Sequence, residues 1–251
     1  MNRQAWLLMT RNQFFGFVRE PAASGFNVLV PFFIVVFQAI AYGGTKVDDL
    51  PGYEVSDVLP ISATTMFVMI IGIFGMGIGL ASMIEARSIA AYRLRPGGVF
   101  GLLSAYGTVL FGVILLGLAV SIAVLAAGWS IHPPHRAWLL LPSLLVTAAF
   151  FIAFGAVGAS LGGSARTAQA LSSALFFPFL FLSGAMFPLD SYPEALKVAA
   201  HVLPGEHVYN LFLYCWVQSE DVPIASIVYL LVGAVALVYA AVALLTRRED
   251  V

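Results

Sequence analysis

The sequence predicts an all-α membrane protein with six transmembrane helices. The chain of 251 residues is 61% hydrophobic and only 10% charged, and its mean hydropathy is +0.95. A soluble globular domain carries roughly 25% charged residues. The apolar residues are also collected into six segments, each long enough to cross a hydrocarbon core about 30 Å thick as a helix. We therefore expect a single domain, residues 1–251, built as a bundle of membrane-spanning helices.

The six predicted spans lie between residues 25 and 245. They are Gly25–Tyr42, Leu59–Met83, Val99–Ala127, Trp138–Leu161, Ala168–Phe187 and Ile224–Leu245. Tyr42, Trp129 and Trp138 lie near the ends of these segments, where aromatic side chains favour the membrane interface. This aromatic placement agrees with the lengths of the segments.

Residues 1–20 precede the first span and mix apolar with basic side chains. The apolar members that fall roughly on one helical side are Trp6, Leu7, Met9, Phe14, Phe17 and Val18. This pattern predicts an interfacial helix lying on the membrane surface, with an irregular tail as the alternative. Arg3, Arg11 and Arg19 interrupt the segment, which argues against a secretory signal peptide.

The distribution of basic residues predicts the membrane orientation. On one side lie the nine residues Arg3, Arg11, Arg19, Arg87, Arg93, Arg95, Arg166, Arg247 and Arg248, and on the other lie Lys46, Arg136 and Lys197. Because cytoplasmic loops carry an excess of Lys and Arg, the first side is predicted to be cytoplasmic, together with both termini. Most acidic residues lie on the opposite side. We expect a multi-pass protein of the cytoplasmic (inner) cell membrane.

None of the 12 basic and 13 acidic residues falls inside a predicted span. Ion-coupled transporters, proton relays and voltage sensors need ionisable groups within the membrane, so the energy for uphill transport would enter from outside the bilayer. The sequence has no G-x-x-x-x-G-K-[ST] loop for binding phosphate. Its four histidines, His132, His135, His201 and His207, form no metal-binding motif. We expect the chain to bind no cofactor of its own.

The loop between the second and third spans carries a short charged segment. Good helix formers run from Glu85 to Arg95, and Pro96-Gly97-Gly98 ends the segment. We predict a short helix, continuous with the membrane helix before it, that docks in a groove of a cytosolic partner. The alternative is that its arginines only set the membrane topology, and their spacing does not decide between the two.

The stretch Phe176–Pro204 joins a spanning segment to one that is too short to span. Pro178 is expected to kink the fifth span, and Pro188 is expected to end it. Ser191 and Glu194 then resemble a capping box with Ser191 as the N-cap. The helix that follows, about eleven residues long, would rise only about 16 Å. With the next apolar piece it is expected to form a re-entrant helical lid, or else a lid that only seals and packs.

Together these features resemble the ABC-2 type permeases, the membrane subunits of type V ABC exporters. The resemblance covers essentially the whole chain: the six spans, the N-terminal interfacial helix, the charged first loop and the run LSGAMFP at residues 182–188. That run is its most specific part. The chain is similar to daunorubicin-resistance permeases and to polysaccharide and teichoic-acid exporters.

The resemblance implies roles for three sets of residues. Residues 85–96 would be the coupling helix, which contacts the ATPase through Glu85, Arg87, Tyr92, Arg93 and Arg95. Residues 2–19 would be the connecting helix. Residues 188–219 would be the extracellular re-entrant helices, and the outer gate would contain Gly184, Phe187, Pro188 and Pro204. Spans one, two and five would line the substrate path, with Phe33, Phe37, Gln38, Phe67, Phe176 and Phe177 as candidates.

One segment departs from the family pattern. The family often has Gly-Thr followed by an acidic residue in the coupling segment, whereas this chain has Ser88-Ile89-Ala90-Ala91. We therefore expect atypical contacts with the ATPase.

The function implied by the resemblance is that of an exporter permease. It would work with two cytosolic ATPase subunits, which bind ATP and Mg²⁺, and with a second permease copy or a sister permease. The aromatic, uncharged path predicts an amphiphilic drug-like or lipid-like substrate, with lipid-linked polysaccharide or glycolipid as the alternative. Membrane lipids are the other expected partners, and nothing in the sequence indicates nucleic acid.

Two hypotheses belong to other classes. A membrane-bound enzyme acting on lipids needs acid–base groups at the interface, and His201, Glu206 and His207 are the plausible cluster. The other hypothesis is a scaffold or an ABC-like regulator that transports nothing, for which the sequence offers no direct signal. Small residues such as Gly72 and Gly155 recur at helical spacings, which predicts close packing within the chain or a subunit interface.

Overall fold

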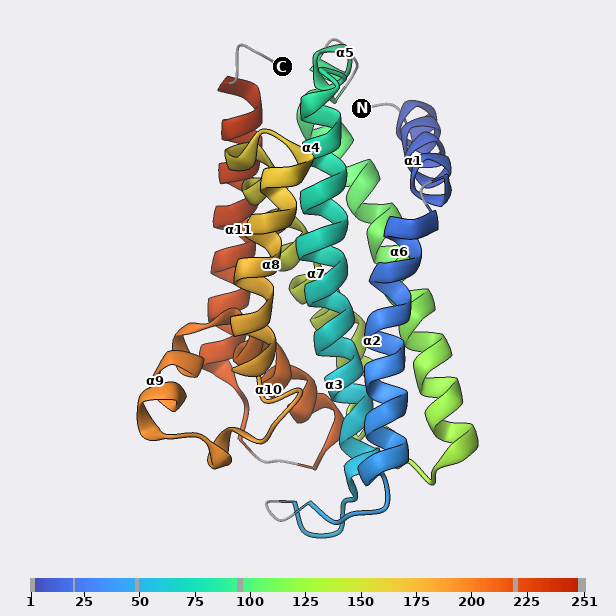
Figure 1. Cartoon of the computed structure of the whole chain (residues 1–251), viewed down its shortest axis with the longest axis vertical. Coiled ribbons are helices and arrows are strands. Elements are labelled where there is room, and N and C mark those ends of the chain that lie inside the picture. Colours follow the sequence, from blue (N-terminus) through green and yellow to red (C-terminus); the bar gives the residue numbers. More distant parts are fainter. Residues whose placement is uncertain (1–2, 20, 48–49, 94–96, 219–220, 248–251) are drawn as a thin grey trace.

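The structure is a computed structural model that describes residues 3–19, 21–47, 50–93, 97–218 and 221–247 (Figure 1). Within these ranges it is helical and has no β-strand. The elements are α1 (Arg3–Val18), α2 (Pro21–Tyr42), α3 (Val55–Ile70), η1 (Ile71–Met76), α4 (Gly77–Glu85), α5 (Ile89–Arg93), α6 (Gly98–Gly128), α7 (Ala137–Gly162), α8 (Ala165–Phe181), η2 (Leu189–Ser191), α9 (Glu194–Val202), α10 (Pro204–Trp216) and α11 (Ile224–Arg247). The all-α prediction is therefore confirmed.

Five helical stretches among the described residues are long and apolar enough to cross a membrane. They are Gly25–Tyr42 in α2, Val55–Glu85 across α3, η1 and α4, Gly98–Gly128 in α6, Ala137–Gly162 in α7 and Ile224–Arg247 in α11. They coincide with five of the six predicted spans. The chain is therefore a multi-pass membrane protein.

The helix α8 differs from the predicted fifth span. The prediction of one helical segment from Ala168 to Phe187 is wrong at its second end, because α8 ends at Phe181. Its 17 residues rise about 26 Å, slightly less than a hydrocarbon core of about 30 Å. Gly184 follows with a positive φ of 86°. This left-handed conformation, which glycine adopts easily, prevents the helix from continuing.

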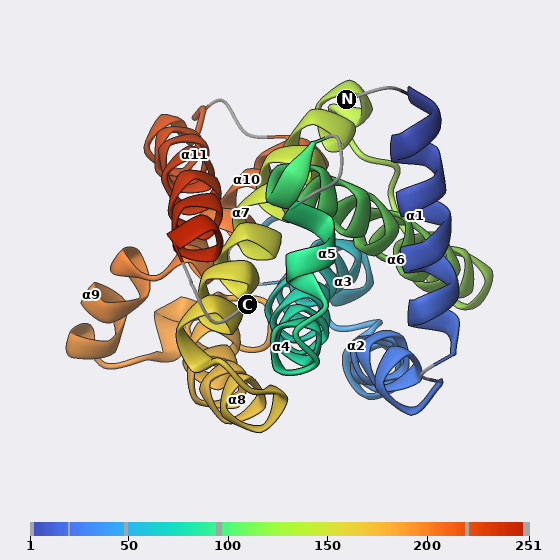
Figure 2. The same cartoon turned by 90° about the horizontal axis from the view of Figure 1, so that it is seen from above.

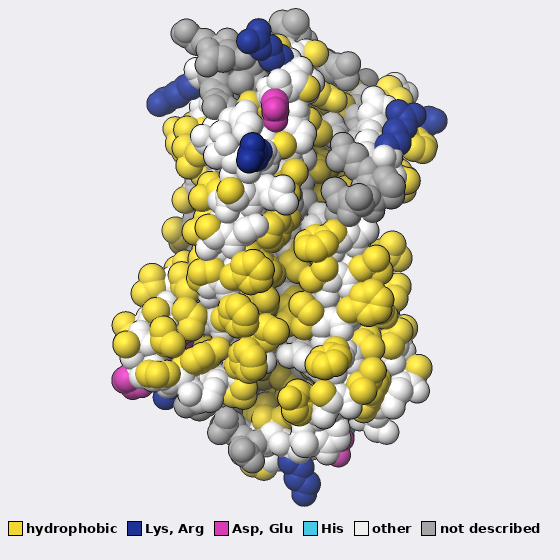
Figure 3. All heavy atoms as spheres, viewed as in Figure 1, with side chains coloured by type: hydrophobic (Ala, Val, Ile, Leu, Met, Phe, Trp, Pro, Cys, Tyr) yellow, Lys and Arg dark blue, Asp and Glu magenta, His cyan; other side chains and the backbone are white. Residues whose placement is uncertain are grey.

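The long helices stand side by side in one bundle, and the short helices lie at its two ends (Figure 1). We call the end with α1 and α5 the α5 end, and the end with α9 and α10 the α10 end. The view from above shows that α1 lies across the bundle axis (Figure 2). Figure 3 shows a broad apolar belt between the ends, with Lys and Arg side chains gathered mainly at the α5 end of that face.

The helix α1 carries apolar side chains on two sides. Met9 and Gln13 are buried where α1 packs on α6. Leu7, Leu8 and Phe14 are instead 50%, 59% and 50% exposed. Of the predicted apolar side, Met9 therefore packs on the bundle while Leu7 and Phe14 face outward. That α1 lies on a membrane surface stays a prediction.

The centre of the bundle is the continuous stretch α3–η1–α4, which α7 crosses at very short range. A Cβ atom added to Gly72 would lie 2.5 Å from the Cβ of Phe151, and one added to Gly155 would lie 2.2 Å from the Gly72 carbonyl oxygen. Only glycine fits where two backbones approach so closely. Of the two predicted roles for these glycines, packing within the chain is confirmed.

The π-helical segment η1 lies in this central stretch and is held by neighbouring side chains. The Tyr106 hydroxyl donates to the Gly75 carbonyl at 2.9 Å, and the Ser172 hydroxyl donates to the Ile73 carbonyl at 3.3 Å. The widened turn of a π-helix is rare and occurs mostly near functional sites. Here it forms part of the wall of the cavity described below.

The segment after α4 is not the continuous helix that was predicted from Glu85 to Arg95. The helix α4 ends at Glu85, Arg87 takes a positive φ of 52°, and α5 begins only at Ile89. A non-glycine residue in this conformation breaks the helical path. Arg95 lies in residues 94–96, outside the described part of the chain.

The capping box predicted at Ser191 is also wrong. The Ser191 hydroxyl donates to the Pro188 carbonyl at 2.7 Å, so it closes the short turn η2. The helix α9 begins three residues later, at Glu194, with Pro193 at its N-cap position. Ser191 is an N-cap in the prediction, but its hydroxyl is used instead for this local hydrogen bond to the backbone, as serine side chains often are.

Candidate functional site

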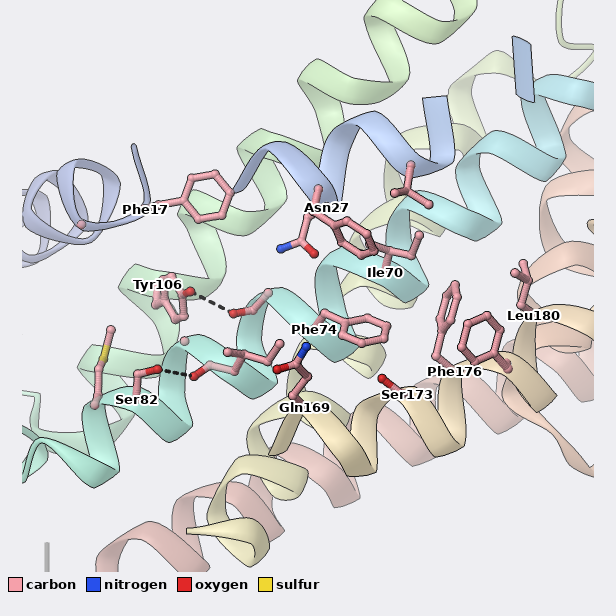
Figure 4. Close-up of a pocket in the computed structure, with 18 of the residues that line it drawn as sticks. Phe17, Asn27, Ile70, Phe74, Ser82, Tyr106, Gln169, Ser173, Phe176 and Leu180 are labelled. Carbon is pink, nitrogen blue, oxygen red and sulfur yellow. Dashed lines mark hydrogen bonds between the residues drawn. The ribbon is translucent and has the colours of Figure 1, made fainter. Parts of the chain in front are cut away.

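A cavity of about 820 Å³ opens between α2, α4 and α8 and reaches α1 and α6. Figure 4 shows side chains from these helices converging on it. No described lining residue is Asp, Glu, Lys, Arg or His. An uncharged cavity of this size suits a molecule that is itself largely apolar.

Uncharged polar side chains supply one part of the cavity wall. Asn27 of α2 and Gln169 and Ser173 of α8 point into the cavity (Figure 4). Tyr106 and Ser82 also line it, but their hydroxyls donate to the Gly75 and Ile78 carbonyls at 2.9 Å and 3.0 Å. The wall can therefore hydrogen-bond to a ligand while carrying no charge.

Aromatic rings supply another part of the wall and continue beyond it. Phe74 packs edge-to-face on Phe176 with ring centroids 5.4 Å apart, and Phe176 packs on Phe177 at 5.5 Å. Phe177 then stacks on Phe181 at 6.3 Å, and Phe181 stacks on Phe187 at 6.2 Å. A row of rings thus leads from the cavity to the turn after α8.

The six residues predicted to line a substrate path lie in different places. Phe176 and Phe177 line the cavity. Phe33 and Phe37 of α2 are 60% and 70% exposed, and Phe67 is fully buried. A contact of any of them with substrate stays a prediction.

A further observation concerns one of these path residues. The Gln38 amide donates to the Met186 carbonyl at 3.5 Å, and it therefore joins α2 to the turn after α8.

Sequence reasoning missed Asn27, Gln169 and Ser173. The spacing of Gln169, Ser173 and Phe176 at i, i+4 and i+7 is the signal that would have placed them on one face.

Two hydrogen bonds join the helices at the α5 end. A Glu85 carboxylate oxygen accepts from the backbone N–H of Ala165 at 3.0 Å, and Ala165 is the first residue of α8. A carboxylate at a helix N-terminus is favoured because it meets unpaired N–H groups and the positive end of the helix dipole. The Gln13 amide of α1 donates to the Tyr92 hydroxyl of α5 at 3.2 Å. Of the other residues predicted to contact an ATPase, Arg87 is exposed, and the Arg93 side chain and Arg95 lie outside the description.

Of the four residues predicted at an outer gate, Gly184 and Pro204 adjoin α10, whereas Phe187 stacks on Phe181 of α8. A Cβ atom added to Gly184 would lie 3.2 Å from the Tyr209 ring. Phe187 is 47% exposed, and Pro204 is buried at the first position of α10. The carbonyl of Pro188 accepts from Ser191 as described above. A gating role for these residues stays a prediction.

The histidine cluster resolves into two separate pairs. His201 Nδ1 lies 2.8 Å from a carboxylate oxygen of the buried Glu206. His207 Nδ1 lies 3.1 Å from the Ser226 hydroxyl, and the His207 ring stacks on Tyr229 at 4.1 Å. Burial lowers the pKa of His207, and the nearby Glu206 partly opposes this shift. The Glu206 carboxylate is thus paired with His201 and not with His207, so it forms no acid–histidine–serine chain of the kind that nucleophilic catalysis uses.

Comparison with known proteins identifies the family. Residues 4–216 match the family model described as ABC-2 type transporter. This chain belongs to that family. Members of the ABC-2 family are transmembrane subunits without ATPase activity of their own, so the ABC-2 chain is expected to depend on a separate ATPase.

The ABC-2 chain is also similar to Nodulation protein J of Rhizobium leguminosarum bv. trifolii. The two are 31% identical over 101 residues, which is 39% of this chain and 36% of that protein. The matched region therefore spans about a third of that relative.

Proposed function

We propose that this chain is the membrane-spanning permease subunit of an ATP-driven ABC exporter that moves an amphiphilic, drug-like or lipid-like molecule out across the cytoplasmic membrane. The observation that carries the proposal is the uncharged cavity of about 820 Å³, whose wall is partly aromatic and partly amide and hydroxyl. Export of a lipid-linked polysaccharide or glycolipid is the second candidate, because a sugar head group also suits amides and hydroxyls.

In the proposed membrane arrangement, α8 is the sixth membrane-crossing element. It packs on α4 and α7, and the turn after Phe181 completes the crossing. The α5 end faces the cytoplasm, which agrees with the nine basic residues assigned to that side by the sequence. The helices α9 and α10 then lie outside and form a lid over the exit.

In the same proposal, α5 is the coupling helix that meets one of two ATPase subunits. Arg87, Arg93 and Arg95 would contact the ATPase. Movement of α5 would reach α1 through the bond between Tyr92 and Gln13, and movement of the adjoining α4 end would reach α8 through the bond of Glu85. Both linked helices line the cavity.

A second permease copy or a sister permease would cover the open side of the cavity. Exposed aromatic side chains flank it on two of the helices that bound it: Phe33 and Phe37 on α2 are 60% and 70% exposed, and Phe177 on α8 is 53% exposed. Aromatic side chains are enriched in the buried centre of interfaces between proteins. The cavity would then lie between two permeases.

The test is purification of the full chain from its own cells in native lipids. We expect a protein that hydrolyses ATP to copurify, and recovery without any ATPase would refute the proposal. In the reconstituted complex, replacing Arg87 and Arg93 by alanine should uncouple ATP hydrolysis from transport while membrane insertion stays normal. Arg247→Ala, at the end of α11, is the matched control for loss of positive charge. Normal coupling in the double variant would mean that these arginines only set the orientation of the chain in the membrane.

A further inference from the structure

We propose that the cavity binds an amphiphile with an uncharged, hydrogen-bonding head group, and that the head lies toward the α5 end and the apolar tail toward the α10 end. This inference rests on the proposed function, because it takes the cavity as the substrate site. It adds the charge class of the substrate and its orientation.

The first observation is the stripe that α8 presents to the cavity. Gln169, Ser173, Phe176 and Leu180 follow one another at i, i+4, i+7 and i+11, and all four line the cavity (Figure 4). Residues at these spacings share one helix face. The two nearer the α5 end are polar and the two nearer the α10 end are apolar, so the polarity of the wall changes between Ser173 and Phe176.

The second observation is that η1 and α4 show the same change from apolar to polar side chains along the cavity. Their chain runs in the opposite direction to that of α8. The bond between Glu85 and Ala165 fixes the register of the two stretches at the α5 end. Ser82 therefore lies in the polar part, one turn from that bond, while Phe74 meets the ring of Phe176 at 5.4 Å in the apolar part. Two independent helical stripes thus place their polar and apolar ends at the same levels.

The third observation is hydrogen-bonding capacity that the protein itself does not use. Asn27 is only 6% exposed, and its amide points into the cavity (Figure 4). Among the described residues, the side chains of Asn27, Gln169 and Ser173 have no hydrogen-bond partner. Gln169 is exposed and Ser173 is half-buried in the cavity wall, whereas Asn27 is largely shielded from solvent. A ligand head group that both donates and accepts would satisfy all three.

The charge class follows from what surrounds these amides. The described lining residues include no Asp, Glu, Lys, Arg or His, and at the α5 end the Glu85 carboxylate is bound to the Ala165 N–H. A charged head group would enter the cavity without a counter-ion and would lose its hydration. A hydroxyl-rich or amide head group loses less hydration free energy, and the amides and hydroxyls of the wall can form hydrogen bonds with it.

The experiment measures equilibrium binding to the full chain in lipid nanodiscs, without any ATPase. The probes are octyl glucoside, octyl sulfate and octyltrimethylammonium, each below its micellar concentration. Octyl glucoside should bind about tenfold more tightly than either charged probe. Equal or weaker binding of the glucoside overturns the inference but leaves the proposed function open. Absence of a partner ATPase would refute the proposed function without affecting this measurement.

Two variants of one residue make the result specific. Gln169→Leu should weaken octyl glucoside binding by about tenfold. Gln169→Glu, which keeps the size of the side chain, should instead raise the affinity for octyltrimethylammonium. Thr108→Val, on α6 outside this cavity, should leave all three probes unchanged. The inference would be overturned if Gln169→Leu left the affinity for octyl glucoside unchanged and Gln169→Glu did not raise the affinity for octyltrimethylammonium.

The orientation has its own readout. A bromine atom at the end of the alkyl chain quenches tryptophan fluorescence at short range. An 8-bromooctyl glucoside should quench a tryptophan introduced as Phe181→Trp more strongly than one introduced as Phe17→Trp, each compared with the parent chain. Stronger quenching at position 17, or equal quenching at both, would overturn the proposed orientation.

Discussion

The two ends of the bundle are held together in different ways. At the α5 end, α8 is tied to α4 by the exposed hydrogen bond from Ala165 to Glu85, and α1 is tied to α5 by the bond from Gln13 to Tyr92. At the α10 end, the Arg136 guanidinium donates to the carbonyls of Tyr214 and Val217 at 2.8 Å and 3.3 Å, and its backbone N–H donates to the Cys215 carbonyl at 2.9 Å. The end of α10 is thus held at several points.

A buried acid adds to the ties at the α10 end. Asp57, in the first turn of α3, is 1% exposed and accepts backbone hydrogen bonds from His132 at 2.6 Å and from Glu54 at 2.9 Å. It fixes the loop before α7 to the start of α3. The α10 end is therefore held at more points than the junction of α4 and α8 at the other end. In the proposed function, this more weakly joined end would shift when the ATPase moves.

The largest effect is expected where α10 meets α8. A Cβ atom added to Gly205 would lie 2.5 Å from the Phe179 carbonyl oxygen, and backbone atoms cannot move aside cheaply. Gly205→Ala should lower the free energy of unfolding by about 3 kcal/mol, measured by thermal unfolding in nanodiscs. Gly112→Ala is the control, because a Cβ atom there meets nothing within 4 Å. Equal stability of the two variants would contradict the tight contact.

The next effect is expected at Arg136. Arg136→Ala removes two charge-assisted hydrogen bonds, to the carbonyls of Tyr214 in α10 and of its C-cap Val217, and the stacking over Tyr214 at 4.1 Å. The free energy of unfolding should fall by about 2 kcal/mol. Arg136→Lys should recover only part of this, because an ammonium cannot reproduce the planar contacts of the guanidinium. Full recovery in the lysine variant would show that charge alone matters.

A smaller effect on stability is expected at the α5 end, together with a larger one on coupling. Glu85→Ala removes the acceptor of the bond to α8, and Ala165→Pro removes its donor. Proline is tolerated at this first helical position, and Ser164 before it is already extended. Each variant should lower the free energy of unfolding by less than about 1 kcal/mol, yet each should reduce substrate-stimulated ATP hydrolysis in the reconstituted complex.

The double variant tests whether Glu85 and Ala165 act through one bond. If they do, the double variant should couple no worse than either single variant. Arg166→Ala, at the neighbouring exposed position, is the control. Losses that add in the double variant would mean that the two residues act separately.

The smallest effect is a pH dependence at His207. Burial lowers the pKa of His207 in the folded chain, while the unfolded chain takes up the proton near pH 6.5. The stabilisation by neutral His207 is therefore complete above about pH 6.5 and is lost as the pH falls from there toward the lowered pKa. Thermal unfolding should lose less stability on acidification in His207→Gln than in the parent chain. An unchanged pH dependence would contradict the shift.

Composition was sufficient to predict the membrane class and five spanning helices, because long apolar runs have one stable form in a bilayer. The local breaks were harder to predict. Arg87 adopts a positive φ and Ser191 bonds to Pro188, and both outcomes depend on surroundings that a propensity does not contain. The pairing of Glu85 with Ala165 joins residues 80 positions apart. The cavity was missed for the same reason, because Asn27 becomes a lining residue only once α2 packs on α3 and η1 while α8 packs on α4.

Neighbouring positions on α8 have different roles: some pack in the bundle and others line the cavity. This division affects which substitutions the chain can accept during evolution. Ala168 and Ser172 are buried, and the Ser172 hydroxyl fastens α8 to the Ile73 carbonyl, while Gln169 and Ser173 face the cavity. Substitutions at the second pair leave the bundle contacts of the first pair intact. If the cavity holds the transported molecule, as in the proposed function, a lineage could acquire a new cargo through one or two codons, with no need to rebuild the scaffold.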